Sequence, residues 1–490
     1  MRLSKLMAAV KDGRAHYKNE EWEREIATLS VDSREKMENG LFFCLKGENA
    51  DGGLFAEQSV KNGAVAVVAE EELGIGVPQI VVKDVREALG LMSSAFYGEP
   101  SARMKVVGIT GTNGKTTTSY MLASILQKAG KNVGVIGTLG ISYNGQTYPS
   151  DLTTPDPVEL QRTLAKMSLH GVEYVVMEVS AHALHYRKIA GISFSACIFT
   201  NLSQDHLDFF TTMTAYKNVK KQLFSNELCP IAVVNGDEET GREIAKEREG
   251  KHTQFYGLNT PADAFAVVTD EGLNGTKCLL NVDDKLFRIS LSMAGRHNVY
   301  NALAAASCAL ALGVSPFAIE AGLNEIKSVN GRLEWVAKWQ DAHIFVDFAH
   351  TPDGLEKSLE ALRPHCKGRL ICLFGCGGNR DKTKRPIMGE IAAKKADFCI
   401  LTSDNPRYED PLDVIVGIEK GYRKFSACYV VVPDRKKALE YALDVLQKGD
   451  VLLVAGKGGE TTQEIMGIKY PFNDHDNIKE LMARKGKNPL

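Results

Sequence analysis

The chain has 490 residues, of which 44% are hydrophobic and 24% charged, a composition typical of a soluble globular protein. Its 59 basic and 61 acidic side chains leave a formal charge of -2, which provides no overall attraction to nucleic acid or to an anionic membrane. No apolar run approaches the ~18 residues needed to span a membrane, the N-terminal text lacks a secretory signal pattern, and no C-x-x-C pair occurs. We therefore expect a cytoplasmic protein with reduced thiols, no nucleic-acid partner and no membrane insertion.

Three domains are expected, because a chain of this length is too long for a single core. Residues 1–103 mix short strands such as Ala64–Ala69 with helices and end in the text YGEPSAR, whose Gly and Pro are typical of a linker. Residues 104–328 alternate strands with helices and end after a helix predicted at Pro316–Ile326. Residues 329–490 repeat the alternation, so the sequence predicts an α/β fold.

A phosphate-binding loop is predicted where the apolar strand Met104–Thr110 leads into the text GTNGKTT and then into a helical pattern. Glycines let backbone N–H groups approach phosphate oxygens, Lys115 can reach the β- and γ-phosphates, and the Thr116 hydroxyl can bind Mg²⁺. The usual pattern has a glycine at the place of Ile109, so this loop is a variant. Its context favours an ATP site over a glycine-rich turn with an incidental Lys-Thr pair. The loop residues are Gly111, Thr112, Asn113, Gly114, Lys115, Thr116 and Thr117.

An acidic side chain for the metal is expected at the end of another strand. The strand Tyr174–Val179 carries Glu178 near its carboxyl end, and the polar cluster TNLSQDHLD follows a later strand. His206 in this cluster is either a second metal ligand or a core histidine, and spacing alone does not decide between the two.

Lys220 lies on an apolar helical stripe in the segment AYKNVKKQLF, together with Tyr216, Val219, Leu223 and Phe224. The lysine is therefore expected to face inward. One interpretation is that its aliphatic stem covers apolar surface while the ammonium stays in water. The other is a lysine with a lowered pKa that is available for unusual chemistry. The residues alone favour the first interpretation.

The last domain has polar text at the end of each predicted strand: DFAHTPD, GCGGNRD, TSDNPR, PDR and AGKGGE. Ligands of open parallel sheets bind at the carboxyl ends of the strands, so this edge is a candidate substrate face. A nucleotide-dependent switch or binding module would need no such second face. The pattern therefore favours an enzyme with a second substrate.

Arg407 is the candidate for binding a substrate carboxylate, because its planar guanidinium can donate two parallel hydrogen bonds. The alternative is that Arg407 caps a surface turn after Pro406. Arg380, at the neighbouring strand end, is a second candidate for a carboxylate. Asn405 can donate and accept hydrogen bonds, which suits an amino-acid head group, and Glu460 can pair with an ammonium.

These motifs resemble those of the Mur ligases, bacterial ATP-dependent amide-forming synthetases, over essentially the whole chain. The matching text is DSR at 32–34, GITGTNGKTT at 108–117, TTPD at 153–156, MEVS at 177–180, TNLSQDHLD at 200–208, Y-x-x-x-K-x-x-L-F at 216–224, HNVYNALAA at 297–305, NGRLE at 330–334, DFAHTPD at 347–353, GCGGNRDKTKRP at 375–386, DNPR at 404–407 and GKGGE at 456–460. The resemblance implies a UDP-substrate-binding domain (1–103), a central P-loop ATPase with a mostly parallel sheet (104–328) and a C-terminal Rossmann-like domain that binds an amino acid (329–490).

Within the family, the motifs look like those of the ligases that add the third residue of the cell-wall peptide. These enzymes use ATP to phosphorylate the D-glutamate side-chain carboxylate of UDP-MurNAc-L-Ala-D-Glu, and an incoming amine then attacks the acyl phosphate. DNPR looks like the version that selects meso-diaminopimelate. L-Lysine is the near alternative, and a folylpolyglutamate-synthase-like ligase is a more distant one. The resemblance implies ATP as co-substrate, Mg²⁺ as cofactor and small-molecule substrates, and we expect a monomer.

The resemblance also implies roles for particular residues. Lys220 would be carbamylated by CO₂ and would form the metal site with Thr116, Glu178 and His206, while Lys115 would be catalytic. Further ATP contacts are implied for Asn298, Asn301 and Arg332. Contacts with UDP-MurNAc-dipeptide are implied for Ser33, Thr153, Thr154, Ser180 and Lys188. Contacts with diaminopimelate are implied for Arg380, Asp404, Asn405, Pro406, Arg407, Gly456 and Glu460.

Several positions depart from the usual text of the family. They are Gly53, Ala181, Lys188, Phe348 and Gly459. Lys188 stands where an arginine usually contacts the nucleotide-peptide substrate. A lysine keeps the charge at this place but cannot form the bidentate pair of an arginine.

Overall fold

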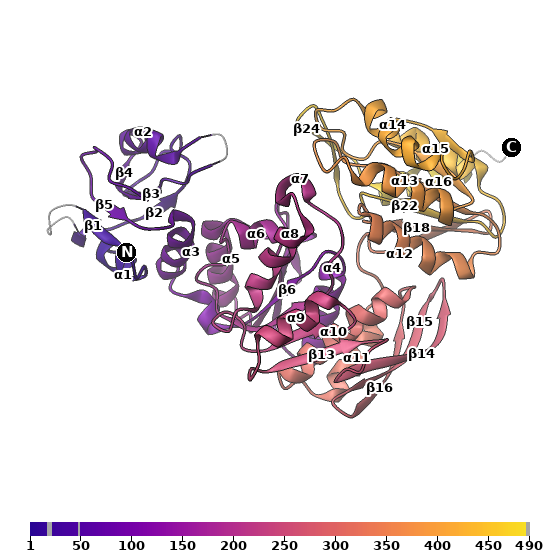
Figure 1. Ribbon diagram of the computed structural model, residues 1–490, viewed down its shortest axis with the longest axis horizontal. Coiled ribbons are helices and arrows are strands. Elements are labelled where there is room, and N and C mark those ends of the chain that lie inside the picture. Colours follow the sequence, from indigo (N-terminus) through magenta and orange to yellow (C-terminus); the bar gives the residue numbers. More distant parts are fainter. Residues whose placement is uncertain (17–21, 48–49, 487–490) are drawn as a thin grey trace. The chain divides into compact units, whose positions relative to one another are not determined.

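The computed structural model describes residues 1–16, 22–47 and 50–486, and Figure 1 shows helices and strands alternating through them. The chain packs into two units. The first comprises Met1–Gly108, Lys131–Ser195 and Ser225–Pro230. The second comprises Ile109–Gly130, Ala196–Phe224 and Ile231–Leu490. The three domain ranges given above stay a prediction.

The N-terminal part of the first unit contains a sheet with the strand order β1-β5-β4-β3-β2. Its strands are β1 (Arg14–His16), β2 (Thr28–Ser30), β3 (Gly40–Phe43), β4 (Ala64–Ala69) and β5 (Gln79–Val81). Strands β2 to β5 are parallel, and β1 is antiparallel at the edge. Side chains alternate between the two faces, so Leu41 and Phe43 share one core with α1 (Leu3–Ala8) and α3 (Val85–Phe96), while Phe42 and Val67 face the other side with α2 (Ala56–Lys61).

The rest of the first unit contains the strand order β10-β7-β8-β9. The elements are β7 (Val133–Gly137), β8 (Gly140–Tyr143), β9 (Gln146–Tyr148), β10 (Tyr174–Glu178), α5 (Pro157–Leu169) and α6 (Ala181–His185). Strands β7 and β10 are parallel and wholly buried, as their continuous apolar text requires. The strand predicted to carry Glu178 is thus confirmed as β10.

The second unit begins with the end of β6 (Lys105–Thr110), which leads through the glycine-rich loop into α4 (Lys115–Lys128). Its strands follow the order β16-β15-β14-β13-β12-β11. They are β11 (Phe194–Phe199), β12 (Ala232–Asn235), β13 (Thr253–Gly257), β14 (Ala264–Gly272), β15 (Gly275–Val282) and β16 (Lys285–Leu291). Strands β11 to β14 are parallel, whereas β14 to β16 form an antiparallel ribbon.

Besides α4, five α-helices belong to this part of the second unit as the structure describes it. They are α7 (Leu207–Phe210), α8 (Met213–Lys221), α9 (Glu239–Glu247), α10 (Arg296–Ala311) and α11 (Pro316–Glu325). The predicted start of α11 is confirmed, because the Ser315 side chain accepts a hydrogen bond from the Ala318 N–H and Pro316 occupies the first turn.

The C-terminal part of the second unit is a sheet with the strand order β17-β18-β22-β19-β20-β21. Its strands are β17 (Glu334–Trp339), β18 (Ala342–Asp347), β19 (Leu370–Phe374), β20 (Phe398–Leu401), β21 (Tyr429–Val431) and β22 (Val451–Ala455). All but β17 are parallel to their neighbours. The helices are α12 (Pro352–Leu362), α13 (Lys384–Lys395), α14 (Pro411–Tyr422), α15 (Arg435–Val445) and α16 (Asp474–Gly486), and a hairpin of β23 (Thr462–Ile465) and β24 (Ile468–Pro471) follows β22.

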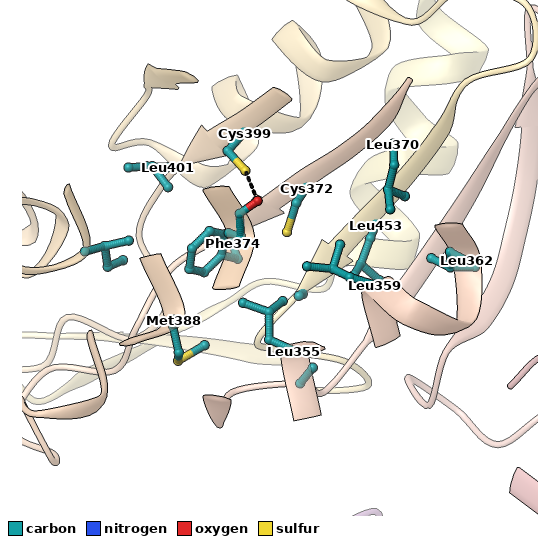
Figure 2. Packing of buried hydrophobic residues seen from close by; sticks show 14 of the residues in the cluster. Leu355, Leu359, Leu362, Leu370, Cys372, Phe374, Met388, Cys399, Leu401 and Leu453 are labelled. Carbon is teal, nitrogen blue, oxygen red and sulfur yellow. Dashed lines mark hydrogen bonds between the residues drawn. The ribbon is translucent and has the colours of Figure 1, made fainter. Parts of the chain in front are cut away.

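Both faces of this C-terminal sheet are covered by helices. Leu370, Cys372 and Phe374 of β19 point to one face, where Figure 2 shows them packed with leucines of α12 and Met388 of α13. Ile371 and Leu373 point to the other face and pack with α15 and α16. This doubly wound arrangement confirms the predicted α/β fold with a Rossmann-like C-terminal sheet.

A buried ion pair joins the first residues of α15 and α16. The Arg435 and Asp474 side chains are both 0% exposed, and two guanidinium nitrogens contact the two carboxylate oxygens at 2.9 and 2.7 Å. Arg435 also donates to the carbonyl oxygens of Ser403, just after β20, and Ala455, at the end of β22, the two strands on either side of β19. The guanidinium therefore ties two helices to the edge of the sheet where the polar strand ends lie.

We expect Asp474→Asn to destabilise the C-terminal sheet, because it leaves the Arg435 charge buried without a counter-charge. Loss of one partner of a buried pair costs about 3–5 kcal/mol, whereas exposed pairs contribute about 0–1 kcal/mol. Hydrogen exchange of the α15 and α16 amides measures the effect as a free energy of opening. Glu480→Gln, which breaks the exposed pair with Lys436, is the matched control. Equal protection in the two variants would contradict this assignment.

Candidate active site

The glycine-rich loop encloses the side chain of its own lysine. Lys115 Nζ donates to the carbonyl oxygens of Gly111 at 2.9 Å and Thr112 at 2.8 Å. Gly111 has φ +146°, and a Cβ there would lie 1.9 Å from Thr200 Oγ1, so only glycine fits. The loop is further held by the Thr112 N–H, which donates to the Asn201 carbonyl. The predicted phosphate loop is thus a tight turn at the start of α4.

Residues far along the chain reach this loop, as the resemblance implies. Asn301 Oδ1 accepts from Thr118 Oγ1 at 3.3 Å, and Asn301 Nδ2 donates to Asn298 Oδ1 at 3.2 Å. Arg332 Nη2 donates to the Thr116 hydroxyl at 2.7 Å, and the guanidinium carbon lies 4.5 Å from the centre of the Phe348 ring. Both asparagines are buried, on α10.

Asn113 and its neighbours are fixed by hydrogen bonds within the second unit. Asn113 Nδ2 donates to Asp353 Oδ2 at 2.7 Å, and the Asn113 N–H donates to Asn201 Oδ1 at 2.9 Å. Thr117 is buried in the first turn of α4. Asp353, at the start of α12, was not singled out in the sequence, although it belongs to the text DFAHTPD.

Lys220 is 1% exposed and lies on α8 with its amine inside the protein. Its Nζ donates to the Gly111 carbonyl at 2.8 Å and lies 4.4 Å from the centre of the Tyr216 ring. Burial lowers the pKa of Lys220 well below its ordinary value, and the nearby Lys115 ammonium lowers it further. The interpretation that the ammonium stays in water is therefore wrong, because the Lys220 amine is buried and contacts a backbone carbonyl.

Asp205 is a buried carboxylate next to several basic side chains. Its Oδ1 lies 3.5 Å from Lys384 Nζ, while its Oδ2 lies 3.3 Å from His206 Nε2 and 3.8 Å from His350 Nε2. Burial alone would raise the pKa of Asp205, but Lys384 and the two imidazoles outweigh burial and hold the pKa below its usual value. His206 is 35% exposed and has a carboxylate beside its ring, which does not fit a core histidine.

Sequence reasoning missed Asp205, His350 and Lys384. All three lie in text that was recognised as motifs, TNLSQDHLD, DFAHTPD and GCGGNRDKTKRP. However, nothing in the spacing of these residues along the chain indicates that their side chains meet.

Within the first unit, Glu178 is the centre of a separate polar cluster. It is 1% exposed and accepts from the Thr138 N–H at 3.0 Å and the Thr138 hydroxyl at 3.1 Å. Thr153 Oγ1 lies 3.2 Å from Thr138 Oγ1, and the Thr154 hydroxyl donates to the Glu178 carbonyl at 2.9 Å. The Ser180 N–H donates to Thr154 Oγ1 at 3.1 Å. Three of the five residues expected to bind the UDP-dipeptide therefore adjoin Glu178.

The other two residues expected to bind the UDP-dipeptide have different surroundings. Lys188 Nζ pairs with Asp156 Oδ1 at 2.7 Å, and its side chain is only 14% exposed. Ser33 is buried in the loop after β2, where its carbonyl accepts from Asn62 Nδ2. No hydrogen bond joins Ser33 to the other four among the residues that the structure describes.

The C-terminal strand ends carry a connected polar network. Asn405 Nδ2 donates to Glu460 Oε2 at 2.9 Å, and Lys457 Nζ donates to both Asn405 Oδ1 at 3.0 Å and Glu460 Oε2 at 2.7 Å. Lys457 is 0% exposed and was not singled out in the sequence. Gly456 has φ +110°, and a Cβ there would lie 2.5 Å from Asp404 Oδ2. Close packing at Gly456 therefore requires glycine.

Arg407 follows Pro406 in a left-handed backbone conformation, with φ +52°. Its Nη1 donates to the Gly378 carbonyl at 2.8 Å, and its Nε lies 3.2 Å from Glu464 Oε2. The side chain is 22% exposed, so it is not a surface cap. Arg380 is exposed, in the loop after β19. The structure thus connects Asn405, Glu460 and Arg407 through Lys457 and Glu464, which the sequence had not indicated, whereas Arg380 has no hydrogen bond to this network among the described residues.

Three family models match the chain: the Mur ligase family catalytic domain over residues 25–97, the Mur ligase middle domain over 109–309 and the Mur ligase glutamate ligase domain over 331–458. The chain is 42% identical over 465 residues to the UDP-N-acetylmuramoyl-L-alanyl-D-glutamate--2,6-diaminopimelate ligase of Caldanaerobacter subterraneus subsp. tengcongensis, and the match covers 94% of this chain and 96% of that protein. The chain belongs to the Mur ligase family.

Other Mur ligases resemble this one over nearly its full length. The protein of the same name from Geobacillus thermodenitrificans is 42% identical over 457 residues, covering 92% of this chain and 93% of that protein. A solved structure of a UDP-N-acetylmuramoyl-L-alanyl-D-glutamate--2,6-diaminopimelate ligase has a TM-score of 0.70 at 29% identity and covers 99% of each chain. None of the helices in the described ranges combines the length and apolar character of a membrane span.

The donor groups of this Mur ligase suit the Mg²⁺ that its family requires. Thr116 supplies a hydroxyl oxygen and Glu178 a buried carboxylate, and Mg²⁺ prefers oxygen ligands. Nowhere in the described ranges do three His, Cys, Asp or Glu side chains gather as a metal cluster. The oxygen donors of Thr116, in the second unit, and of Glu178, in the first, are each of the kind that Mg²⁺ prefers.

We expect Gly111→Ala to weaken ATP binding in this Mur ligase by about tenfold or more, because a Cβ would force the loop away from Thr200 and a strained residue costs about 1–3 kcal/mol. Binding of a fluorescent ATP analogue measures the effect. Gly272→Ala is the control, since a Cβ at Gly272 meets nothing within 4 Å. Unchanged binding in Gly111→Ala would contradict the role of this turn in holding phosphate.

Proposed function

We propose that this Mur ligase adds meso-diaminopimelate to the D-glutamate side-chain carboxylate of UDP-MurNAc-L-Ala-D-Glu, through an acyl phosphate, in peptidoglycan precursor synthesis. ATP is consumed and ADP and phosphate are released. The observation that carries the proposal is the C-terminal strand-end face, where Arg407 lies close to the Asn405–Glu460 network. The relatives named as diaminopimelate ligases, at 42% identity over nearly the full chain, support the same substrate.

The chemistry requires positive charge near the phosphates. A carboxylate is a poor electrophile, so a phosphoryl group must first be transferred to it from ATP, and phosphate is then the leaving group when the amine attacks. Lys115 would supply this charge once its Nζ leaves the loop carbonyls for the β- and γ-phosphates. When bound, Mg²⁺ would offset the remaining phosphate charge. Arg332 and Asn301, which already contact the loop and α4, would hold the nucleotide in place.

The substrates would then be divided among the proposed domains. Residues 1–103 would bind the uridine nucleotide, residues 104–328 ATP, and residues 329–490 the amino acid. Thr153, Thr154, Ser180, Lys188 and Ser33 would contact the UDP-dipeptide. The residues that would contact diaminopimelate are Arg380, Asp404, Asn405, Pro406, Arg407, Gly456 and Glu460.

We further propose a monomer that works in the cytoplasm on these small molecules. ATP as co-substrate supports this location. The ten cysteines, which all lie in the described ranges, are free thiols, as is usual in a reducing compartment.

Recognition of a second carboxylate distinguishes diaminopimelate from L-lysine. The Arg407 guanidinium would bind that carboxylate. With L-lysine as the substrate, the guanidinium would have no substrate carboxylate to bind. A site built around a polar group rejects an analogue that lacks its partner, often by about a hundredfold or more. A folylpolyglutamate-synthase-like activity is disfavoured by the DNPR text at 404–407 and by the N-terminal domain with the text DSR at 32–34.

A substrate panel tests the proposal directly. Purified enzyme with ATP, Mg²⁺ and UDP-MurNAc-L-Ala-D-Glu should release phosphate rapidly with meso-diaminopimelate. L-Lysine should be used with a kcat/KM lower by about a hundredfold or more. Phosphate release without the amino acid should be slow. A nucleotide-dependent switch would instead release phosphate at a rate that does not depend on the amino acid. Equal use of L-lysine and meso-diaminopimelate would overturn the proposed specificity.

We propose, in addition, that Lys220 carries a carbamate in the active enzyme. Its unprotonated amine can attack CO₂, forming an N–C bond with loss of a proton, and the resulting carbamate would place negative charge beside His206 and the metal. The buried position of Lys220 and its lowered pKa support the proposal.

Lys220→Ala should lose activity by about a hundredfold or more, and short carboxylates such as acetate should partly restore it. A carbamate signal should appear in ¹³C spectra of wild-type enzyme supplied with ¹³CO₂ and disappear in the variant. Lys217→Ala, which removes a partly buried lysine of the same helix that pairs with Glu243, is the control and should retain both. Wild-type rates for Lys220→Ala would contradict the proposal.

A further inference from the structure

We infer that Glu464 is a positioning residue for amino-acid selection, because it holds the Arg407 guanidinium in place for a second substrate carboxylate. The inference rests on the proposed function and names a residue beyond the motifs that carry it. Glu464 lies in β23, and its side chain is 28% exposed.

The β23–β24 hairpin is attached to the loop that carries Arg407 by backbone hydrogen bonds. The Arg407 N–H donates to the Glu464 carbonyl at 3.1 Å, and the Met466 N–H donates to the Arg407 carbonyl at 2.7 Å. This forms a parallel bridge between Arg407 and Ile465. The hairpin thus fixes both backbone groups of Arg407 despite its left-handed conformation.

The same hairpin fixes the residues before Arg407. The Glu464 N–H donates to Asn405 Oδ1 at 3.0 Å, and Gln463 Nε2 donates to the Asp404 carbonyl at 2.7 Å. These bonds use backbone and glutamine groups, so they survive a change in the side chain of Glu464. The side chain can therefore be tested separately from the hairpin.

The Arg407 guanidinium is held from two sides. The Glu464 carboxylate lies 3.2 Å from Nε, while Nη1 donates to the Gly378 carbonyl at 2.8 Å. The GCGG loop can come this close because a Cβ at Gly378 would lie only 1.9 Å from the Pro406 carbonyl. The side-chain hydrogen bonds and ion pairs of Arg407 in the described ranges involve Nη1 and Nε, and none involves Nη2.

This geometry leaves one edge of the guanidinium for a ligand. Each terminal nitrogen carries two N–H groups, and only one N–H of Nη1 is used by Gly378. A substrate carboxylate is repelled from the Nε side by the Glu464 anion and can form two parallel hydrogen bonds with the Nη1–Nη2 edge. Glu464 therefore acts on the substrate only through the orientation of Arg407.

A positioning role predicts an effect confined to substrates that have the second carboxylate. In Glu464→Ala, the KM for meso-diaminopimelate should rise by about tenfold, while kcat and the KM for ATP stay within about twofold. The low kcat/KM for L-lysine should not change, because lysine has no carboxylate for Arg407. The ratio of kcat/KM for meso-diaminopimelate to kcat/KM for L-lysine should therefore also fall by about tenfold.

Two further variants make the test specific. Glu464→Gln keeps the volume and a hydrogen-bond acceptor, so its KM should lie between those of wild type and Glu464→Ala. Glu480→Gln, which removes an exposed carboxylate paired with Lys436 on the same C-terminal sheet domain, should behave as wild type.

The outcomes separate the inference from the proposed function. Wild-type enzyme that does not ligate meso-diaminopimelate would overturn the proposed function and this inference with it. A different outcome would overturn the role of Glu464 alone. In that outcome wild-type enzyme ligates meso-diaminopimelate, and Glu464→Ala has the same KM for it and the same discrimination against L-lysine as wild type. A parallel fall of kcat/KM for both amino acids would mean that Glu464 is only structural, and would also overturn the inference.

Discussion

One carbonyl oxygen, that of Gly111, accepts hydrogen bonds from two lysine amines. Lys115 Nζ lies 2.9 Å and Lys220 Nζ 2.8 Å from this atom. Burial lowers the pKa of the Lys220 amine well below its ordinary value, and the positive charge of Lys115 beside it lowers the pKa further. The roles proposed for the two lysines depend on this arrangement, since the proposed phosphate contact of Lys115 needs a charged amine and the proposed carbamylation of Lys220 needs an unprotonated one.

This arrangement holds only because of the backbone at Gly111. Its φ of +146° and its contact with Thr200 direct the carbonyl toward both amines. The start of α4, the end of β6 and the inward stripe of α8 therefore converge on a single peptide group. Asp205 lies near the same helix, and its negative charge partly offsets the local excess of cations.

The sequence could predict most of the fold and the parts of the site that lie within one motif. The apolar strand β6, the loop and α4 are contiguous, so their text alone indicates a phosphate site. Helical spacing correctly predicted that Lys220 lies inside the protein. It could not predict the lowered pKa of the amine or its hydrogen bond, because these depend on burial and on Lys115 and Gly111 in another segment. Helical periodicity predicts whether a side chain lies on the buried face of its helix, but it does not predict which charged residue from a distant part of the chain lies next to that side chain.

Contacts between distant segments were beyond such reasoning. Asp205 and Lys384 meet across nearly two hundred positions of the chain, a separation that leaves no local pattern. Lys457 is 0% exposed although an isolated lysine is expected at the surface, and only the paired carboxylate of Glu460 explains its burial. Glu464 lies in a short exposed hairpin whose text has no polar motif, so its contact with Arg407 was not foreseen.

Left-handed backbone conformations recur at the polar strand ends, at His206, Asn379 and Arg407, with φ of 55°, 50° and 52°. Such a conformation costs a residue with a side chain about 1–2 kcal/mol, and glycine would relieve that strain. Selection for heat resistance alone would therefore favour glycine at His206 and Arg407. Variants chosen in that way would gain stability and lose the imidazole and the guanidinium, so directed evolution of this enzyme for thermostability has to be screened for turnover at every round.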